Sequence, residues 1–297
     1  MSSELNFKNK TVLITGGASG FGFELVKLFL SDGAKVIFTT REKTSAEKAI
    51  TEIPEINQKN VRYYTVDLSN KIEIDKFVMS LDKDFPSGID VLVNNAASII
   101  VGKFEKFTYD DLISTFTVNL VSSYMLSLHV IKKMKEKKNG VIVNIISGVA
   151  NIGLPFLSLY GIGKSSLRAF SESISVELKE DNIDVIMVSP GAMNTAQEKK
   201  QKLIGIEKSP YENMKKASPE IIAKKVFKKI KKKEALIEFS LKTKLFELLQ
   251  LISFRTAFNI KRKYTKKQYW SYIPESNLLT VSLLRYLGIN YRDHIFS

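Results

Sequence analysis

Residues 15–22 read TGGASGFG and stand between a short apolar run, residues 11–15, and a helical pattern that begins near Phe23. Gly16 allows a tight turn, Gly20 lets the backbone approach a pyrophosphate, and Gly22 lets the following helix pack close to the strand. The helix N-terminus then offers unpaired N–H groups and the positive end of its dipole. A strand, a glycine turn and a helix in this order predict a site for the phosphates of a dinucleotide.

Apolar runs rich in β-branched residues alternate with segments of helical periodicity through the first 190 residues. Continuous apolar runs are typical of strands buried on both faces, and the alternation predicts a parallel sheet covered by helices on both sides. We therefore expect a Rossmann-type doubly wound α/β fold of about seven strands, with ligands beyond their carboxyl ends. Strands are expected at residues 11–15, 35–40, 61–65, 91–94, 141–146, 184–189 and 235–239, and helical periodicity at residues 23–30, 72–81, 126–134 and 220–231.

The formal charge of +14 is confined to one part of the 297-residue chain. Residues 1–198 sum to −1, residues 199–272 to +15 and residues 273–297 to zero. The charge therefore says little about the predicted sheet. The chain has no cysteine, which excludes disulfides, thiolate metal sites and a cysteine nucleophile. His129 and His294 lie in no cluster with metal-ligand spacing, so we predict no metal and no histidine catalysis.

Three residues separate Gly16 from Gly20, and with this spacing the chain resembles the short-chain dehydrogenase/reductase family from about residue 8 to residue 240. The sugar-nucleotide epimerases among its extended relatives have a shorter turn, which disfavours that class. Asn94 to Ala97 resembles the family's NNAG, with Ala97 replacing the glycine. The other matching residues are Asp67 and Leu68 after the third strand, Asn119 in TVNL, Ser147 after the fifth strand, Tyr160 and Lys164 in YGIGK, and Pro190, Gly191 and Thr195 in PGxxxT.

The tyrosine–lysine spacing occurs twice, as Tyr160 with Lys164 and as Tyr211 with Lys215. Tyr160 follows the strand that Ser147 ends, whereas no strand precedes Tyr211, so we assign the first pair to catalysis and the second to a solvated helix face. Residues four apart share one helix face. The Lys164 ammonium and an oxidised nicotinamide would lower the pKa of the Tyr160 phenol and favour acid/base work near neutral pH.

The resemblance implies further roles for this group. Lys164 would also bind the nicotinamide ribose, Ser147 would hold the substrate oxygen, and Asn119 would support a proton relay through water. The cofactor would be held by Gly16, Ser19, Gly20, Phe21, Gly22, Thr40, Arg41, Asp67, Leu68, Asn94, Ala96, Tyr160, Lys164, Pro190, Gly191, Met193 and Thr195.

The end of the second strand bears on the choice of cofactor. NAD-dependent folds place an acid there for the ribose 2′-OH, but this chain has Thr40 followed by Arg41. A guanidinium matches a phosphate in charge and geometry. We therefore expect NADP(H), with NAD(H) the less favoured cofactor. Two observations oppose this: Arg41 can instead pair with Glu42, and Ser19 stands where some NADP-dependent relatives carry a basic residue.

The chain is expected to divide into a catalytic Rossmann domain, residues 1–240, and a helical basic extension, residues 241–297. Residues 241–260 read as an amphipathic helix, and lysines and the aromatic residues Tyr269, Trp270 and Tyr272 follow it. Residues 241–272 therefore suit an anionic membrane surface, packing on the domain or contact with a partner subunit; nucleic acid is the least favoured partner. The resemblance also implies a homo-oligomer formed through the long helices that carry Asn119 and Tyr160. Residues 1–10 lack a secretory apolar region, so we expect a cytoplasmic protein, free or peripheral on a membrane.

These features predict an NADP(H)-dependent oxidoreductase that moves a hydride between the nicotinamide and a secondary alcohol/ketone pair. By resemblance, the segments after Ser147 and Gly191 shape the substrate pocket, and their apolar residues favour a steroid, retinoid or keto-lipid. These residues are Val149, Ile152, Leu154, Phe156, Met193, Leu203, Ile204 and Ile206. The alternatives are a reductase of a small polar carbonyl and a silent NADP-binding scaffold or sensor.

Overall fold

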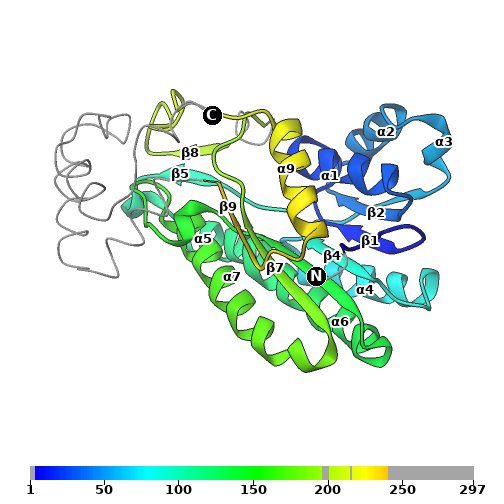
Figure 1. Ribbon diagram of the computed structural model, residues 1–297. Helices are drawn as coiled ribbons and strands as arrows, with labels where there is room; N and C mark the ends of the chain where they lie inside the picture. Colours follow the sequence, from blue (N-terminus) through cyan, green and yellow to red (C-terminus); the bar gives the residue numbers. More distant parts are fainter. Residues whose placement is uncertain (1–3, 196–200, 215, 240–297) are drawn as a thin grey trace, which may run out of the picture. The chain divides into compact units, whose positions relative to one another are not determined.

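The computed structural model describes residues 4–195, 201–214 and 216–239 (Figure 1). The strands are β1 (Thr11–Ile14), β2 (Lys35–Thr40), β3 (Val61–Thr65), β4 (Val91–Asn94), β5 (Ile100–Gly102), β6 (Gly140–Ile145), β7 (Ile183–Ser189), β8 (Lys202–Ile204) and β9 (Leu236–Glu238). The α-helices are α1 (Gly20–Ser31), α2 (Lys43–Thr51), α3 (Glu55–Gln58), α4 (Lys71–Asp84), α5 (Tyr109–Phe116), α6 (Ser122–Lys137), α7 (Ser158–Glu177) and α9 (Pro219–Lys231). Short helical turns are η1 (Phe104–Lys106), the π-helical η2 (Thr117–Val121), η3 (Gly148–Ala150) and η4 (Lys179–Asp181).

Within the described residues, the main sheet is parallel and has the strand order β3-β2-β1-β4-β6-β7-β9. The chain runs outward from β1 to β3 and then returns to place β4 on the other side of β1. Strand order therefore reverses between β1 and β4, and the crevice beyond their carboxyl ends is where sheets of this kind bind ligands. Thr15 and Asn95, the residues that follow these two strands, stand at that point.

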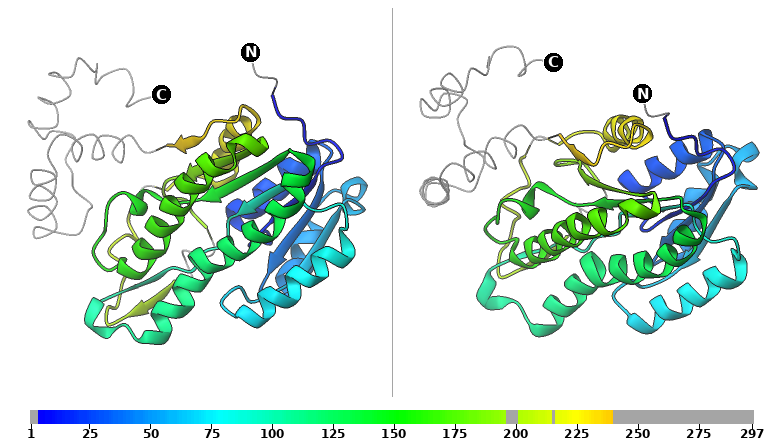
Figure 2. Two further views of the ribbon diagram at one scale, coloured as in Figure 1. Left: turned by 90° about the horizontal axis from the view of Figure 1, so that it is seen from below. Right: turned by 60° about the horizontal axis from the view of Figure 1, so that its bottom comes forward.

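Helices cover both faces of the sheet (Figure 2). On one face, α1, α2 and α9 bury residues such as Phe29 and Val226 against Val12 and Ile14 of β1. On the other face, α4, α6 and α7 pack against Leu13 of the same strand. Successive strand residues thus enter opposite cores, which is why the strands read as continuous apolar runs. The predicted doubly wound architecture is confirmed.

Aromatic contacts hold α9 onto the N-terminal half of the chain. The Phe29 ring on α1 lies 4.9 Å from Phe7 and 5.0 Å from Phe227 of α9, measured between ring centroids. Edge-to-face pairs of this kind add to the free energy of burying the rings. The aromatic contacts therefore hold α9 in place. Ala217, two residues before α9, forms a β-bridge with Met193 in the segment after β7.

The seven predicted strands all occur, and each predicted bound lies within one residue of the observed one. The small parallel pair β5–β8 was not predicted, because three-residue strands carry too little periodicity to recognise. Residues 210–214 belong to a second compact unit, in which the Met214 N–H donates to the Tyr211 carbonyl. The predicted extension, residues 241–297, and Lys215 of the second tyrosine–lysine pair lie outside the described residues. Tyr211 of that pair is buried in a turn, so its predicted place on a solvated helix face is wrong. No described helix is long and apolar enough to cross a membrane.

Candidate active site

The glycine turn after β1 has the conformation that the sequence predicts. Gly16 and Gly20 have φ values of +65° and +57°, which side chains other than glycine rarely adopt. A Cβ on Gly22 would lie 2.4 Å from both the Gly16 carbonyl oxygen and Asn95 Nδ2. Ser19 makes no side-chain capping bond, and the first turn of α1 has no acidic residue. The turn therefore leaves N–H groups for a phosphate, and only glycine fits at its closest approach.

Two residues outside the predicted set join this turn to the end of β4. The Thr15 hydroxyl accepts hydrogen bonds of 2.9 Å from the N–H groups of Asn95 and Ala96. In return, Asn95 Nδ2 donates to the Thr15 and Gly16 carbonyls at 2.8 and 3.2 Å. Asn95 stands in the quoted NNAA motif, but only the tertiary contact reveals that it locks the turn.

The segment after β7 closes on the same turn. A Cβ on Gly20 would meet the Thr195 methyl group at 3.3 Å, so residues 175 positions apart in sequence are neighbours. Asn194 and Ala192 hydrogen-bond Ala217 through the backbone, which holds residues 191–195 in place. Pro190 is buried, whereas Gly191 is exposed with a φ of +77°. The predicted cofactor residues at the two ends of the motif set thus meet in space.

Arg41 is exposed beyond β2 and forms no ion pair with any described residue. The Glu42 carboxylate, which the sequence offered as an ion-pair partner for Arg41, instead accepts a hydrogen bond from the Ser45 hydroxyl at 3.0 Å. Thr40 is half-buried beside it, and its hydroxyl accepts a 3.5 Å hydrogen bond from the Glu42 N–H. This rim therefore offers one uncommitted guanidinium to an anion.

After β3, the Asp67 carboxylate accepts 2.8 and 2.9 Å bonds from Ser69, and the Asp67 N–H donates to Glu73 at 2.7 Å. Leu68 is buried beside it. These local bonds hold the turn after β3 at the rim of the crevice. Glu73, on α4, had no motif to mark it.

Two predicted cofactor residues turn their side chains into the protein. The Phe21 ring is buried in the core below α1. Asn94 Nδ2 donates to Asn144 Oδ1 across the sheet at 2.8 Å and to Ser127 at 3.3 Å, and Asn144 in turn donates to Ser171 at 2.8 Å. Any contact of Phe21 or Asn94 with a cofactor must therefore come from their backbone.

Ser147, Tyr160, Lys164 and Asn119 are brought together by β6, η2 and α7. Ser147 lies two residues after Ile145, the last residue of β6, and its hydroxyl accepts a hydrogen bond from the Val149 N–H at 3.3 Å. Lys164 Nζ lies 5.9 Å from the centroid of the Tyr160 ring and donates a 2.6 Å bond to the Ile145 carbonyl. A Cβ on Gly163 would lie 2.7 Å from the Asn119 Cβ, so the glycine inside YGIGK lets α7 approach η2.

Asn119 is fully buried and its side chain is committed. Its Oδ1 accepts from the Ser98 N–H, and its Nδ2 donates to the Ser98 carbonyl, both at 2.9 Å. The residue lies in the π-helical turn that precedes α6, an irregularity often found at functional sites. The side chain therefore joins η2 to the segment after β4.

Burial controls the protonation of this group. It lowers the pKa of Lys164 to about 7, because the ammonium is poorly solvated. It also raises the pKa of Tyr160 to about 12, although a hydrogen bond with Ser147 acts in the opposite direction. The protein's own groups therefore do not produce the low tyrosine pKa that we expected from the sequence. With a pKa of about 7, Lys164 is charged only part of the time at neutral pH, so it favours the phenolate less than a permanently charged lysine would.

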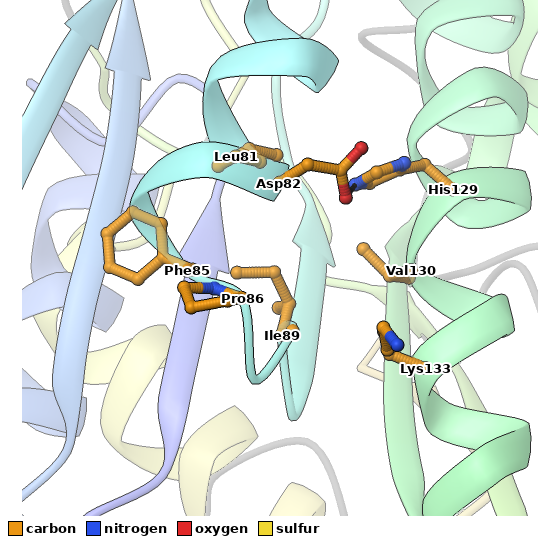
Figure 3. Close-up of a pocket in the computed structure, with 9 residues that line it drawn as sticks. Leu81, Asp82, Phe85, Pro86, Ile89, His129, Val130 and Lys133 are labelled. Carbon is orange, nitrogen blue, oxygen red and sulfur yellow. Dashed lines mark ion pairs between the residues drawn. The ribbon is translucent and has the colours of Figure 1, made fainter.

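His129 lies apart from this group, in a small pocket between α4 and α6 (Figure 3). Its Nε2 is 3.4 Å from Asp82 Oδ1, and the two side chains point toward each other across the pocket. Burial lowers the pKa of His129 more than Asp82 raises it. His294 lies outside the described residues. Among the residues that the structure describes, no group of three acids or histidines could hold a metal ion.

Comparison with protein families matches residues 10–203 to the model described as short chain dehydrogenase. This chain belongs to the short-chain dehydrogenase family. The matched residues include the glycine turn, Asn119, Ser147, Tyr160 and Lys164. The chain is therefore an oxidoreductase of the type that acts on alcohol and carbonyl groups.

Two curated members of the family illustrate its range. The 3-oxoacyl-(acyl-carrier-protein) reductase FabG of Chlamydia trachomatis serovar D is 30% identical over 187 residues, which cover 63% of this chain and 75% of that protein. The 5-keto-D-gluconate 5-reductase of Escherichia coli K12 is 29% identical over 197 residues, which cover 66% and 76%. A short-chain dehydrogenase of Sphingobium yanoikuyae, solved in complex with NADPH, has the same fold with a TM-score of 0.71, 20% identity and coverage of 90% of this chain and all of that one.

Proposed function

We propose that this dehydrogenase is an NADP(H)-dependent enzyme that interconverts a secondary alcohol and a ketone, with Tyr160 as the proton donor and acceptor. The observation that carries this proposal is the buried Lys164, which stands one helical turn after Tyr160 and opposite the strand end that leads to Ser147. Burying an amine costs folding free energy, so a buried lysine suggests a functional role. Clusters of residues with perturbed pKa values are typical of active sites. The cofactor, when bound, supplies or receives the hydride.

In the reductive direction, the Ser147 hydroxyl and the Tyr160 phenol bind the carbonyl oxygen of the substrate. Tyr160 gives its proton to that oxygen as negative charge develops there, and Ser147 steadies the charge with its hydrogen bond. Lys164 then stabilises the phenolate that remains and helps it to regain a proton. In the oxidative direction, the same groups remove the alcohol proton.

Asn119 supports this site as a positioning residue. Because both polar atoms of its side chain are engaged by Ser98, any link from Lys164 to solvent water would use the Asn119 backbone. The side chain then serves to hold η2 beside α7, where the Asn119 backbone is placed. Asn119→Ala is expected to lower turnover without removing any group that contacts the substrate.

The glycine turn fits the pyrophosphate of a dinucleotide, since its two left-handed glycines and the tight contact at Gly22 leave backbone N–H groups in place of side chains. Arg41, with Thr40, would bind the 2′-phosphate of NADP(H). Asp67 and Leu68 would border the adenine, and Lys164 the nicotinamide ribose. Backbone groups of Phe21, Asn94, Ala96 and residues 190–195 would complete the site.

For the substrate, we favour an apolar ketone or alcohol such as a steroid, retinoid or keto-lipid. Val149 and Ile152 are buried in the segment after Ser147, and Met193 is half-buried in the segment after Gly191. Leu203 remains partly exposed on β8. A small polar carbonyl is the second candidate, because a relative of similar identity is a 5-keto-D-gluconate reductase.

For assembly, we propose a homo-oligomer formed through α6 and α7, where Tyr124, Leu128, Ile162 and Val176 are exposed. We also propose a cytoplasmic enzyme that attaches to anionic membranes through residues 241–272. Lys225 and Lys228 on α9 and Lys232 directly after it lie at the spacing of one helix face, are exposed, and form no ion pair with a described residue. Pelleting with anionic but not neutral vesicles tests the attachment.

The rate of NADPH oxidation, measured with 2-decanone, a 3-ketosteroid or 5-keto-D-gluconate as substrate, tests the reaction and the substrate class together. We expect the highest kcat/KM with an apolar ketone. Preference for 5-keto-D-gluconate would reverse the substrate proposal. Tight NADPH binding without turnover of any carbonyl would instead favour the silent scaffold.

A further inference from the structure

The three-residue strand β5 lies between two segments that come from distant parts of the sequence. One edge of β5 pairs in parallel with β8, in the register Ile100–Lys202, Val101–Leu203 and Gly102–Ile204 (Figure 1). At the other edge, the Gly102 N–H donates a 2.9 Å bond to the Phe156 carbonyl, in the segment that follows Ser147. Since backbone groups alternate between the two edges of a strand, β5 contacts both segments at once.

The residue that leads into β5 is tied to the candidate catalytic group. Ser98 makes the two 2.9 Å bonds with Asn119 described above. On the Phe156 side, the Ser165 hydroxyl on α7 donates to the Ala150 carbonyl at 2.9 Å. Hydrogen bonds and covalent chain therefore connect Asn119 to β5, β5 to residues 150–156, and these residues to α7.

Gly102 permits the closest approach in this arrangement. A Cβ at this position would lie 2.4 Å from the Ile204 carbonyl oxygen and 3.0 Å from the Phe107 ring. The nearest obstacle is backbone, which a side-chain rotation cannot relieve. Any residue other than glycine must therefore push β8 away from β5.

A long-range ion pair fixes β8 from outside the ladder. Lys202 Nζ lies 2.7 Å from Asp111 Oδ1, across 91 positions of sequence, and the other oxygen of Asp111 accepts from Thr108 in the capping box of α5. The Asp111 side chain is 8% exposed and that of Lys202 is 62% exposed. The Lys202 hydrogen bond holds the pKa of Asp111 below its ordinary value. The buried Asp111 carboxylate therefore holds Lys202, the first residue of β8, by an ion pair.

We infer that β5 is a shared support for the two substrate segments, and that Gly102, Lys202 and Asp111 are positioning residues that set the width of the substrate pocket. The inference rests on the proposed function, in which residues 149–156 and 203–206 line that pocket. None of the three residues would contact the cofactor or move a proton. Their loss should therefore weaken binding of the ketone while sparing the chemical step and NADPH binding.

The test compares Gly102→Ala, Lys202→Met and Asp111→Asn with Lys231→Met. The last variant removes a matched ion pair between residues distant in sequence, Lys231 Nζ–Asp32 Oδ1, which is also 2.7 Å long. It joins the last residue of α9 to the residue that follows α1. With 2-decanone or a 3-ketosteroid as substrate, we expect the KM of the first three to rise about fivefold to tenfold, with kcat and the Kd for NADPH within about twofold of wild type. The KM of the double variant Lys202→Met/Asp111→Asn should be close to that of each single variant, because the two substitutions remove the same ion pair.

Amide hydrogen exchange of residues 100–103 and 202–204 supplies a second readout that needs no substrate. Exchange should accelerate about fivefold in Lys202→Met and Asp111→Asn but not in Lys231→Met. Unchanged exchange, unchanged KM in an active enzyme, or an equal rise of KM in Lys231→Met would each overturn the inference. If wild type reduces no ketone, the proposed function fails, and the exchange data alone decide whether this ion pair holds β8 on β5.

Discussion

The Lys164 ammonium donates a 2.6 Å hydrogen bond to the carbonyl of Ile145, the last residue of β6, and Lys164 is 1% exposed. This single bond satisfies one of three donors of an amine that has almost no contact with water. Burial lowers the pKa of Lys164 to about 7, so the residue changes charge near neutral pH. The same burial that prepares Lys164 for chemistry therefore destabilises the folded protein.

Lys164→Met should stabilise the protein at pH 7 while abolishing turnover. The pKa is lowered in the folded state from an ordinary value of 10.5, so between pH 10.5 and about 7 the unfolded chain binds a proton that the folded chain does not. Wild-type stability therefore falls as the pH drops through this window. Allowing for the lost Ile145 bond, we expect a gain of about 2–3 kcal/mol at pH 7.

Urea denaturation at pH 7 and pH 10.5 measures this effect. The gain should shrink toward zero at the higher pH, where lysine is neutral in the folded state and half of it is neutral in the unfolded state. A variant that is less stable than wild type at both pH values would contradict the assigned cause.

Tyr160→Phe should reduce kcat about a thousandfold or more, because the phenyl ring keeps the packing but has no proton to give. The Kd for NADPH, measured by fluorescence titration, should stay within about twofold of wild type. Tyr124→Phe on the exposed side of α6 is the matched control and should retain full activity. Turnover by Tyr160→Phe at the wild-type rate would remove Tyr160 from the mechanism.

Arg41→Ala should raise the Kd for NADPH about tenfold and leave the Kd for NADH unchanged, because only the former carries the 2′-phosphate. Lys43→Ala, which removes a nearby exposed cation paired with Glu47, should change neither value. Isothermal titration with both cofactors provides the comparison. Equal affinity of the wild type for NADPH and NADH would refute the assignment.

Asn144→Ala should lower the free energy of unfolding by about 3 kcal/mol, because it leaves the buried amide of Asn94 and the hydroxyl of Ser171 with one partner fewer. Ser171→Ala removes the bond from Asn144 and the 2.6 Å bond that the Ser171 hydroxyl donates to the Leu167 carbonyl, and should cost about 1–2 kcal/mol. Ser173→Ala, at an exposed position of the same helix, should be nearly neutral. Equal effects of the two serine variants in thermal or urea unfolding would argue against the network.

The fold could be read from local patterns because each β–α unit carries its own signal. Residues 11–30 illustrate this: the apolar run, the glycine turn and the periodic helix each restrict the backbone independently of the rest of the chain. β5 and β8 escaped prediction for the opposite reason. Three residues have no periodicity to recognise, and these strands exist because Gly102 and Ile204 meet across a hundred positions of sequence.

By itself, the sequence determined which polar groups follow each strand: a glycine turn after the first strand, an arginine after the second, and Ser147, Tyr160 and Lys164 around the fifth. These are short-range facts, since spacing along one helix or one turn sets which groups share a face. Only the tertiary structure decided that Asn94 and Phe21 turn inward, that Asn95 locks the turn, and that burial raises the pKa of Tyr160 to about 12 instead of lowering it. Solvation and hydrogen bonding depend on what packs around a group, and most of those neighbours are distant in sequence.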